Sequence, residues 1–345
     1  MIADRIEGKW IELFAAVFAR CKVGAGDPCA VLSETQSRAL NVQLSELALH
    51  RLGARPFHVI VPTPRQSAPV PIRSTGASTA LQGLVPAVGA LASSTFVADC
   101  TLEGLMHAAE LPQILKGGTR VLYISNEHPD VLERLAPSPA DEQQVRAGMR
   151  RLKDAKRMQV SSAAGTQLEI GVEGARIGGV WGYTEKPGTL SHWPGGLCLA
   201  FPKSGSVNGV LVMAPGDLNL TFKRYVESEV RLKIDDDYVT AIEGSGLDAE
   251  LMREYFAAWN EREAYAVSHV GWGTNPRARW DALVMYDRCD VNGTEQRAFA
   301  GNFLYSTGAN EVAGRHTLGH FDLPFRRCTV LLDGHAVVRD GQLTG

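Results

Sequence analysis

Two histidines and an aspartate lie within seven positions near the C-terminal end of the chain. The stretch 314–324 reads GRHTLGHFDLP and contains His316, His320 and Asp322. Imidazole nitrogens and carboxylate oxygens are common ligands of zinc and iron, so the composition of this stretch indicates a candidate metal site. Which of the three side chains could share one ion depends on the conformation of the backbone.

A helix and a strand would group these side chains differently. In a helix, His316 and His320 would stack one turn apart and Asp322 would point away. In a strand, His320 and Asp322 would share a face with Cα atoms about 6.5 Å apart, and His316 would lie about 13 Å from His320. Gly319 weakens a helix, Pro324 disfavours one just before it, and an Asp-Gly hairpin pattern follows. We therefore predict that His320 and Asp322 form the pair and that His316 lies outside it.

A third ligand is needed, and His269 is the candidate. It lies in AYAVSHVGWGTNP (264–276), at the end of an apolar stretch and before a glycine-rich turn. Two imidazoles and one carboxylate form the arrangement that suits non-haem Fe(II) and leaves positions open for substrate and O₂. Zinc with a catalytic water is the alternative, because it also accepts three protein ligands. The chain contains neither the GxSxG nor the HExxH signature of hydrolases.

The elements that must position these residues fall into two kinds along the chain. In the first half, short apolar runs alternate with helical patterns, which predicts a parallel, doubly wound α/β sheet. Ser33 is expected to cap the first of these helices together with Gln36, and the helix should end near Gly53. The expected strands are 28–33, 56–62, 94–100 and 119–125, and further helical segments are expected at 79–92 and 102–116.

A strongly capped helix precedes a change in sequence texture. Over 138–157, Ser138 is the expected N-cap and Pro139 occupies the first helical position. After it come short β segments broken by glycine and proline, and a helix at 248–265. We therefore predict an α/β domain over 1–160 and an α+β metal-binding catalytic domain over 161–345.

Composition restricts the classes of partner. The chain has 345 residues, is 45% hydrophobic and carries a formal net charge of −3, which argues against nucleic acid or an anionic membrane surface. No apolar run approaches the roughly 18–20 residues of a membrane span, and the N-terminal stretch lacks the pattern of a signal peptide. The cysteines have no CxxC spacing and are expected to be reduced and buried in a cytoplasmic protein. They are Cys21, Cys29, Cys100, Cys198, Cys289 and Cys328.

Several segments together resemble one enzyme family. SHVGWGTNP, HWPGG, RAFAGNFLYSTGAN and GHFDLP are similar to the 2,5-dihydroxypyridine 5,6-dioxygenases, ring-cleaving enzymes of nicotinate and nicotine breakdown. This family is a divergent relative of the aminopeptidase T-type metallopeptidases. Where those peptidases carry metal-binding glutamates, this chain has Leu197 and His269, and Ser306 stands where they carry a histidine. His320 and Asp322 are retained, so the resemblance implies one mononuclear Fe(II) site in place of a two-metal cluster.

The resemblance also implies roles for other residues. His107 and His192 would act in proton transfer or contact the substrate, although each could be a structural histidine. Arg297 and Ser306 would hold the oxygen atoms of the pyridine, or Arg297 could form a structural ion pair. Two aromatic residues are expected as pocket walls, and they are Tyr305 and Trp193.

The implied reaction opens the C5–C6 bond of 2,5-dihydroxypyridine with O₂ to give N-formylmaleamate. The implied assembly is a ring-like homo-oligomer such as a hexamer. Two alternatives stay open, an aminopeptidase and a non-catalytic protein that binds hydroxypyridines on the same fold. The missing glutamate at Leu197 argues against the aminopeptidase.

Overall fold

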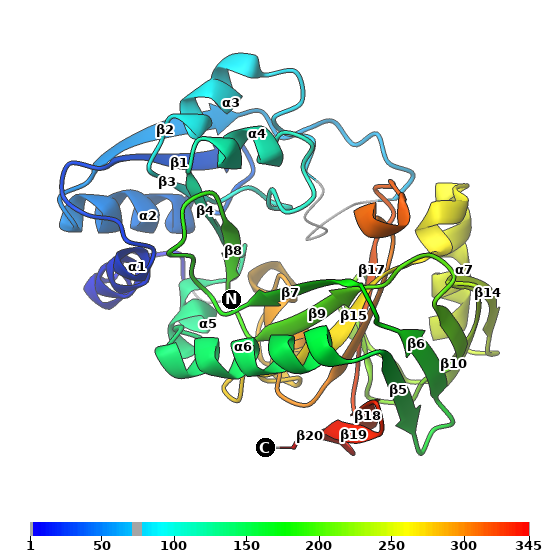
Figure 1. Ribbon diagram of the computed structural model, residues 1–345. Helices are drawn as coiled ribbons and strands as arrows, with labels where there is room; N and C mark the ends of the chain where they lie inside the picture. Colours follow the sequence, from blue (N-terminus) through cyan, green and yellow to red (C-terminus); the bar gives the residue numbers. More distant parts are fainter. Residues whose placement is uncertain (1–2, 71–77, 345) are drawn as a thin grey trace.

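The first part of the chain forms a parallel sheet of five strands. The computed structural model describes residues 3–70 and 78–344. The strands follow the order β2-β1-β3-β4-β8, and every neighbouring pair is parallel (Figure 1). Their bounds are β1 Pro28–Glu34, β2 Arg55–Val61, β3 Phe96–Asp99, β4 Arg120–Ile124 and β8 Leu190–Trp193.

Helices cover both faces of this sheet. Because successive side chains of a strand point to opposite faces, Val31 of β1 packs in the core with Phe14 and Leu44, whereas its neighbour Leu32 packs with Leu91 on the other face. The predicted α/β architecture with a parallel sheet is therefore confirmed. The helices are α1 Gly8–Arg20 and α2 Ala39–Arg51 on the first face, and α3 Val85–Ala92 and α4 Leu111–Lys116 on the second.

Three local predictions for this part differ from the structure. Ser33 lies within β1, and α2 begins at Ala39 without a side-chain cap. The predicted helix over 102–116 exists only at α4, because the buried Asp99 carboxylate organises the chain after β3 as a loop. It accepts hydrogen bonds from the N–H groups of Thr101 and Leu105 at 3.0 Å. Likewise, the predicted helix over 79–92 begins only at Val85.

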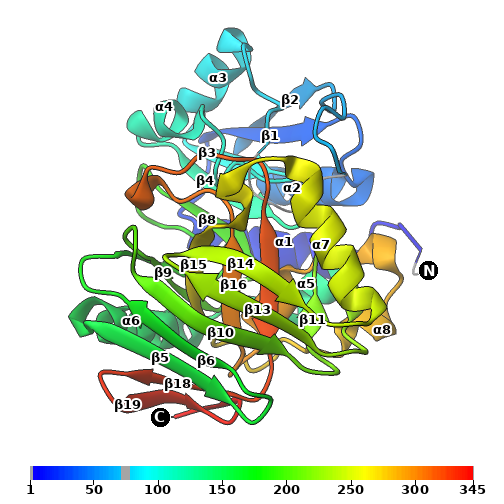
Figure 2. The same ribbon diagram turned by 90° about the vertical axis from the view of Figure 1, so that its right-hand side faces the viewer.

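The second part is built from antiparallel sheets. An eight-stranded sheet has the order β14-β13-β10-β6-β5-β18-β19-β20, a five-stranded sheet has the order β17-β16-β15-β9-β7, and β11 pairs with β12 (Figure 2). The bounds of the first sheet are β5 Arg157–Ser162, β6 Gln167–Gly171, β10 Val207–Met213, β13 Val230–Asp235, β14 Tyr238–Glu243, β18 Cys328–Leu332, β19 His335–Arg339 and β20 Gln342–Leu343. Those of the others are β7 Arg176–Val180, β9 Leu197–Phe201, β15 Val267–Gly273, β16 Phe303–Thr307, β17 Phe321–Phe325, β11 Leu218–Asn219 and β12 Arg224–Tyr225.

Helices and short turns complete this part. The predicted N-cap at Ser138 is confirmed, because its side chain accepts a hydrogen bond from the N–H of Asp141. The Asp141 carboxylate in turn accepts a hydrogen bond from the N–H of Ser138. The predicted helix at 248–265 ends earlier, at Trp259, where Asn260 takes a left-handed conformation. The elements are α5 Pro129–Arg134, α6 Pro139–Asp154, α7 Leu247–Trp259, α8 Ala282–Met285 and α9 Thr294–Ala298, with 3₁₀ turns η1 Arg262–Tyr265, η2 Arg288–Asp290 and η3 Glu311–Ala313.

The two parts exchange elements across residue 160. Strand β8 lies beyond it in sequence but completes the N-terminal parallel sheet, and α6 lies before it but packs against β7 and β9 (Figure 1). The division into 1–160 and 161–345 stays a prediction. Each of the two parts contains an element from the other side of residue 160 in sequence.

Two predictions from composition concern cysteines and membranes. All six cysteines are free thiols, and five are buried, whereas Cys289 is exposed, contrary to the expectation for that residue. Within the part of the chain that the structure describes, no helix combines the length and apolar character that crossing a bilayer requires.

Candidate metal centre and active site

The candidate metal ligands lie on neighbouring strands of the five-stranded sheet. In the strand register, His269 of β15 is opposite Ser306 of β16, and Ser306 is opposite Asp322 of β17. His320 immediately precedes β17. The Oδ1 atom of Asp322 lies 3.2 Å from Nε2 of His320 and 3.8 Å from Nε2 of His269. One ligand atom from each of these three residues lies within 4.8 Å of the others, so they can converge on one ion.

The electrostatics of this cluster favour forms that can bind a cation. Burial lowers the pKa of His269 to about 3, so its imidazole is neutral near pH 7. Burial alone would raise the pKa of Asp322, but Arg297 and the neighbouring histidines hold it well below its ordinary value. Metal ligands must be neutral imidazole and ionised carboxylate, so this donor set fits a divalent cation.

Further contacts fix the orientation of the ligands. The Ser306 hydroxyl donates to Oδ1 of Asp322, and Nε of Arg297 donates to Oδ2 at 2.6 Å. The Tyr255 hydroxyl donates to the carbonyl of His320 at 2.6 Å. Such outer contacts hold metal-binding side chains in place and tune their basicity.

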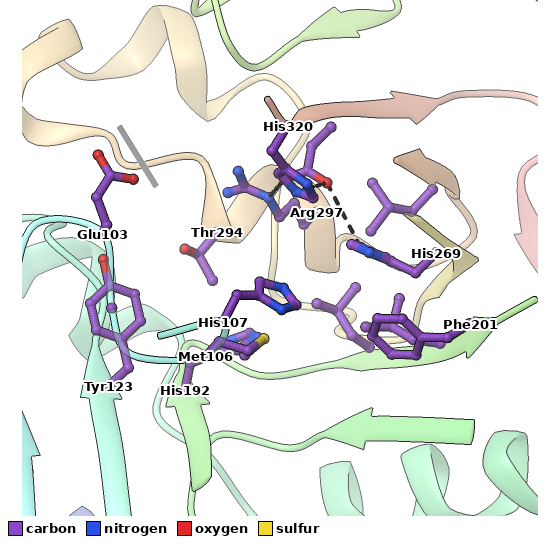
Figure 3. A pocket seen from close by; sticks show the side chains of 15 residues that line it. Glu103, Met106, His107, Tyr123, His192, Phe201, His269, Thr294, Arg297 and His320 are labelled. Atoms are coloured by element: carbon purple, nitrogen blue, oxygen red, sulfur yellow. Dashed lines mark hydrogen bonds and ion pairs between the residues drawn. The ribbon is translucent and has the colours of Figure 1, made fainter. Parts of the chain in front are cut away.

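A cavity lies between this cluster and the loops at the carboxyl ends of the parallel strands (Figure 3). It contains about 610 Å³ of empty space, which includes open solvent at its mouth. Beyond the ligands, its lining residues are Glu103, Gly104, Met106, His107, Tyr123, His192, Leu197, Leu199, Phe201, Thr294, Arg297 and Leu304.

The two predicted proton-transfer histidines both reach this cavity from the parallel-sheet part. His107 lies in the loop after β3, and its ring centre is 6.3 Å from that of His320. His192 lies on β8, and its Nδ1 is 2.6 Å from the Pro194 carbonyl, so Nδ1 must donate and Nε2 is left as an acceptor. Burial lowers the pKa of each of these two histidines to about 4, so both rings are neutral near pH 7.

Three predicted substrate contacts do not line the cavity. Trp193 and Tyr305 each follow a residue that does line it, and alternation along the strand turns both rings the other way. Trp193 packs against Phe14 and donates to the Leu135 carbonyl at 3.0 Å. The hydroxyl of Ser306 is directed to Asp322, so Arg297 is the one of these four predicted contacts that lines the cavity.

The structure separates His316 from the cluster, as the strand interpretation predicts. His316 lines a different hollow together with Arg176, Glu261 and Glu311. His107 borders both spaces, so this hollow adjoins the mouth of the cavity.

Sequence reasoning missed several residues of the cavity wall. Thr294 stands three positions before Arg297 on α9, and Phe201 ends the apolar run GLCLAFP. Glu103 lies in the loop after β3, and Tyr123 lies on β4. Their location near the carboxyl ends of parallel strands was the available signal, because α/β sheets bind ligands there.

Fold and site together define a protein in which an α/β part closes one side of a buried centre with two histidines and an aspartate. The family model described as 2,5-dihydroxypyridine 5,6-dioxygenase matches residues 9–345. The chain belongs to this family of ring-cleaving dioxygenases and is an enzyme.

Individual relatives agree with this assignment. The chain is 37% identical over 336 residues to the 2,5-dihydroxypyridine 5,6-dioxygenase of Pseudomonas putida KT2440, covering 96% of this chain and 95% of the relative. The solved structure of 2,5-dihydroxypyridine dioxygenase from that organism matches with a TM-score of 0.93 and 34% identity, over 100% of this chain and 99% of the other.

A more distant structure shares the fold. AmpT from Thermus thermophilus matches with a TM-score of 0.59 at 14% identity, over 98% of this chain and 99% of the other. At this level of identity, the match shows the layout of the fold alone.

Proposed function

We propose that this chain is an Fe(II)-dependent 2,5-dihydroxypyridine 5,6-dioxygenase that forms N-formylmaleamate, within nicotinate or nicotine degradation. The observation that carries the proposal is the convergence of His269, His320 and Asp322 at the wall of a small cavity, in a chain of this family. Two imidazoles and one carboxylate are the donor set of non-haem Fe(II) oxygenases.

The metal's contribution would be to allow an electron-rich ring to react with O₂, which is otherwise slow because O₂ has a triplet ground state. C5 and C6 of the ring each gain one oxygen atom and the bond between them breaks. Both atoms of O₂ therefore remain in the product, and no further reductant is required. The protein then has to bind the ring, remove a proton and exclude bulk water.

His107 is the proposed base for the 5-hydroxyl proton. It is neutral near pH 7, lies next to His320 and lines the same cavity as the candidate ligands, so it can reach the hydroxyl of a ring held there. His192 is the second acceptor, through Nε2. Arg297 has its Nε committed to Asp322, and its cationic guanidinium at the cavity wall stabilises negative charge that develops on the ring.

An aminopeptidase would need a second metal, and the structure favours the dioxygenase instead. Within residues 3–70 and 78–344, a single group of three or more His, Cys, Asp and Glu side chains has the spacing of a metal site. At the cavity wall, where those peptidases have a glutamate, the side chain is Leu197. A non-catalytic binding protein would be distinguished by the absence of turnover.

The test is O₂ uptake after anaerobic loading with Fe(II). Addition of O₂ and 2,5-dihydroxypyridine should consume one O₂ per ring. Equal consumption without iron or with zinc would contradict the proposal, and a leucyl-anilide assay with Zn²⁺ or Co²⁺ tests the aminopeptidase.

Variants test the ligand assignment in the same assay. His269→Ala and Asp322→Ala should each lose bound iron, measured by metal analysis, together with turnover. His316→Ala is the matched control and should keep both, because His316 lies outside the cluster. Full iron binding and activity in the first two variants would remove the assignment.

A further inference from the structure

The cavity has two chemically different ends. Around His269 its wall is apolar, with Phe201 against the imidazole at 5.3 Å between ring centres. At the other end lie Glu103, Tyr123 and Thr294, and Figure 3 shows the Thr294 hydroxyl directed toward this end and away from His269. A ring bound at the ligand cluster would therefore have a polar wall beyond it.

A chain of buried hydrogen bonds lies behind this polar wall. The Asn292 amide donates to Oγ of Ser125 at 2.8 Å and to the Tyr123 hydroxyl at 3.1 Å. Tyr123 in turn donates to the Leu102 carbonyl at 3.0 Å, so its proton is already used. Oγ of Ser125 lies 2.8 Å from Oγ1 of Thr294, which ends the chain at the cavity.

Thr294 is held in place on both its side chain and its backbone. Its side chain has Ser125 as partner, and its N–H donates to Oε1 of the buried Glu127 at 3.1 Å. A hydroxyl can make one donor and up to two acceptor contacts, so one bond to Ser125 leaves capacity for a ligand. Ordered support of this kind fixes a polar group within the tolerance that recognition needs.

We propose that Thr294 is a specificity-determining residue that hydrogen-bonds the heteroatom edge of the substrate, formed by the ring nitrogen and the oxygen on C2. The inference rests on the proposed function. In 2,5-dihydroxypyridine the two oxygens are para to each other, so placing the 5-oxygen at the ligand cluster directs the other oxygen and the adjacent nitrogen away from it. Thr294 lies at that opposite end, where a rigid hydroxyl can exchange a hydrogen bond with this edge.

The experiment compares anaerobic binding of 2,5-dihydroxypyridine and phenol to the Fe(II)-loaded protein. Phenol keeps one hydroxyl but lacks both the ring nitrogen and the second oxygen. In the wild type, 2,5-dihydroxypyridine should bind more tightly, because a site built to bond polar groups rejects ligands that lack them. Thr294→Val keeps the shape of the side chain and removes the hydroxyl. It should reduce the ratio of the phenol Kd to the 2,5-dihydroxypyridine Kd by about 10-fold.

Two further variants separate recognition from a loss of structure. Thr294→Ser keeps the hydroxyl and should keep the ratio. Thr119→Val removes another buried hydroxyl, which donates to the Ser94 carbonyl at 2.8 Å before β4, and should leave the ratio unchanged. An unchanged ratio in folded Thr294→Val, or an equal loss in Thr119→Val, would overturn the inference.

A fallback keeps the test decisive if Thr294→Val does not fold. Ser125→Ala leaves the Thr294 side chain but removes its partner, and it should lower the ratio about threefold, whereas an unchanged ratio would count against the inference. Failure of the wild type to bind or convert 2,5-dihydroxypyridine would instead contradict the proposed function.

Discussion

At the scale of single residues, Asp322 is the centre on which the site's contacts converge. Its two oxygens contact His320, His269, Ser306 and Arg297. A carboxylate with this many partners is held ionised and in one orientation, which a metal ligand requires. Ser306 and Arg297 are not candidate ligands, but they should affect metal affinity because they hold Asp322.

Ser306→Ala removes the hydroxyl that donates to Asp322. Metal affinity should fall about 10- to 100-fold, as for other outer contacts of metal ligands, and titration with Fe(II) under anaerobic conditions measures it. Ser45→Ala is the control, because it removes a buried hydroxyl on α2 that donates to the Asn41 carbonyl. Wild-type affinity in Ser306→Ala would show that this hydroxyl does not position the ligand.

His107→Gln should lower kcat by about 10²- to 10⁴-fold, the usual contribution of a positioned base, while the iron content stays unchanged. Steady-state O₂ uptake and metal analysis give the two values. His58→Gln on β2 is the control, because His58 pairs with Glu46 away from the cavity. A kcat equal to the wild type would exclude His107 as the base.

At the scale of elements, the register of β15, β16 and β17 assembles the site. A shift of one residue in either pairing would turn His269 or Asp322 to the opposite face of the sheet. The chain between β16 and β17 must also return closely enough to bring His320 to the start of β17. Gly308, with a φ of +116°, makes that return, and a Cβ there would lie 2.3 Å from the Gly319 carbonyl oxygen.

Gly308→Ala should therefore destabilise the fold by about 1–3 kcal/mol and weaken metal binding, because the clash displaces the segment that ends at His320. Chemical denaturation and metal titration measure the two effects. Gly314→Ala is the matched control, since Gly314 has a φ of +70° but no atom within 4 Å of an added Cβ. An equal response in both variants would mean that backbone strain alone, without the clash, explains the loss.

At the scale of the whole molecule, the site needs both parts of the chain. The part with the parallel sheet supplies His107, from the loop after β3, and His192, from β8. The part with the antiparallel sheets supplies the candidate ligands. Glu127, which follows β4, connects the parts by accepting the N–H groups of Thr294 and Glu295 on α9. Arg134 adds a bond to Oε2 of Glu295 at 2.9 Å.

Glu127 should make stability depend on pH. Burial, reinforced by Glu295, raises its pKa from 4.5 to about 7. Between these values the unfolded carboxyl loses its proton while the folded one keeps it, so stability falls as pH rises through this window. Glu127→Gln lacks this titration, and its unfolding free energy relative to the wild type should rise by on the order of 1–3 kcal/mol from pH 4.5 to 7.5. Urea denaturation across this range measures the change, and a pH-independent difference would contradict it.

Local patterns in the sequence determined much of this protein. The apolar runs of β1 to β4, the N-cap at Ser138 and the Asp-Gly hairpin of β18 and β19 all appear as predicted, because each depends on neighbours in the chain. The pairing of His320 with Asp322 follows from the period of a strand in the same way. The resemblance supplied the family, which the comparisons confirm.

Tertiary structure decided the rest. Three features depend on partners far away in sequence. They are the faces of their sheets to which Trp193 and Tyr305 point, the pairing of β8 with the parallel sheet, and the place of Thr294 at the cavity. His269 and Asp322 are 53 positions apart, and two strand pairings through Ser306 bring them together. Periodicity shows which residues of one strand share a face, but the register between strands is set by the packing of the complete core.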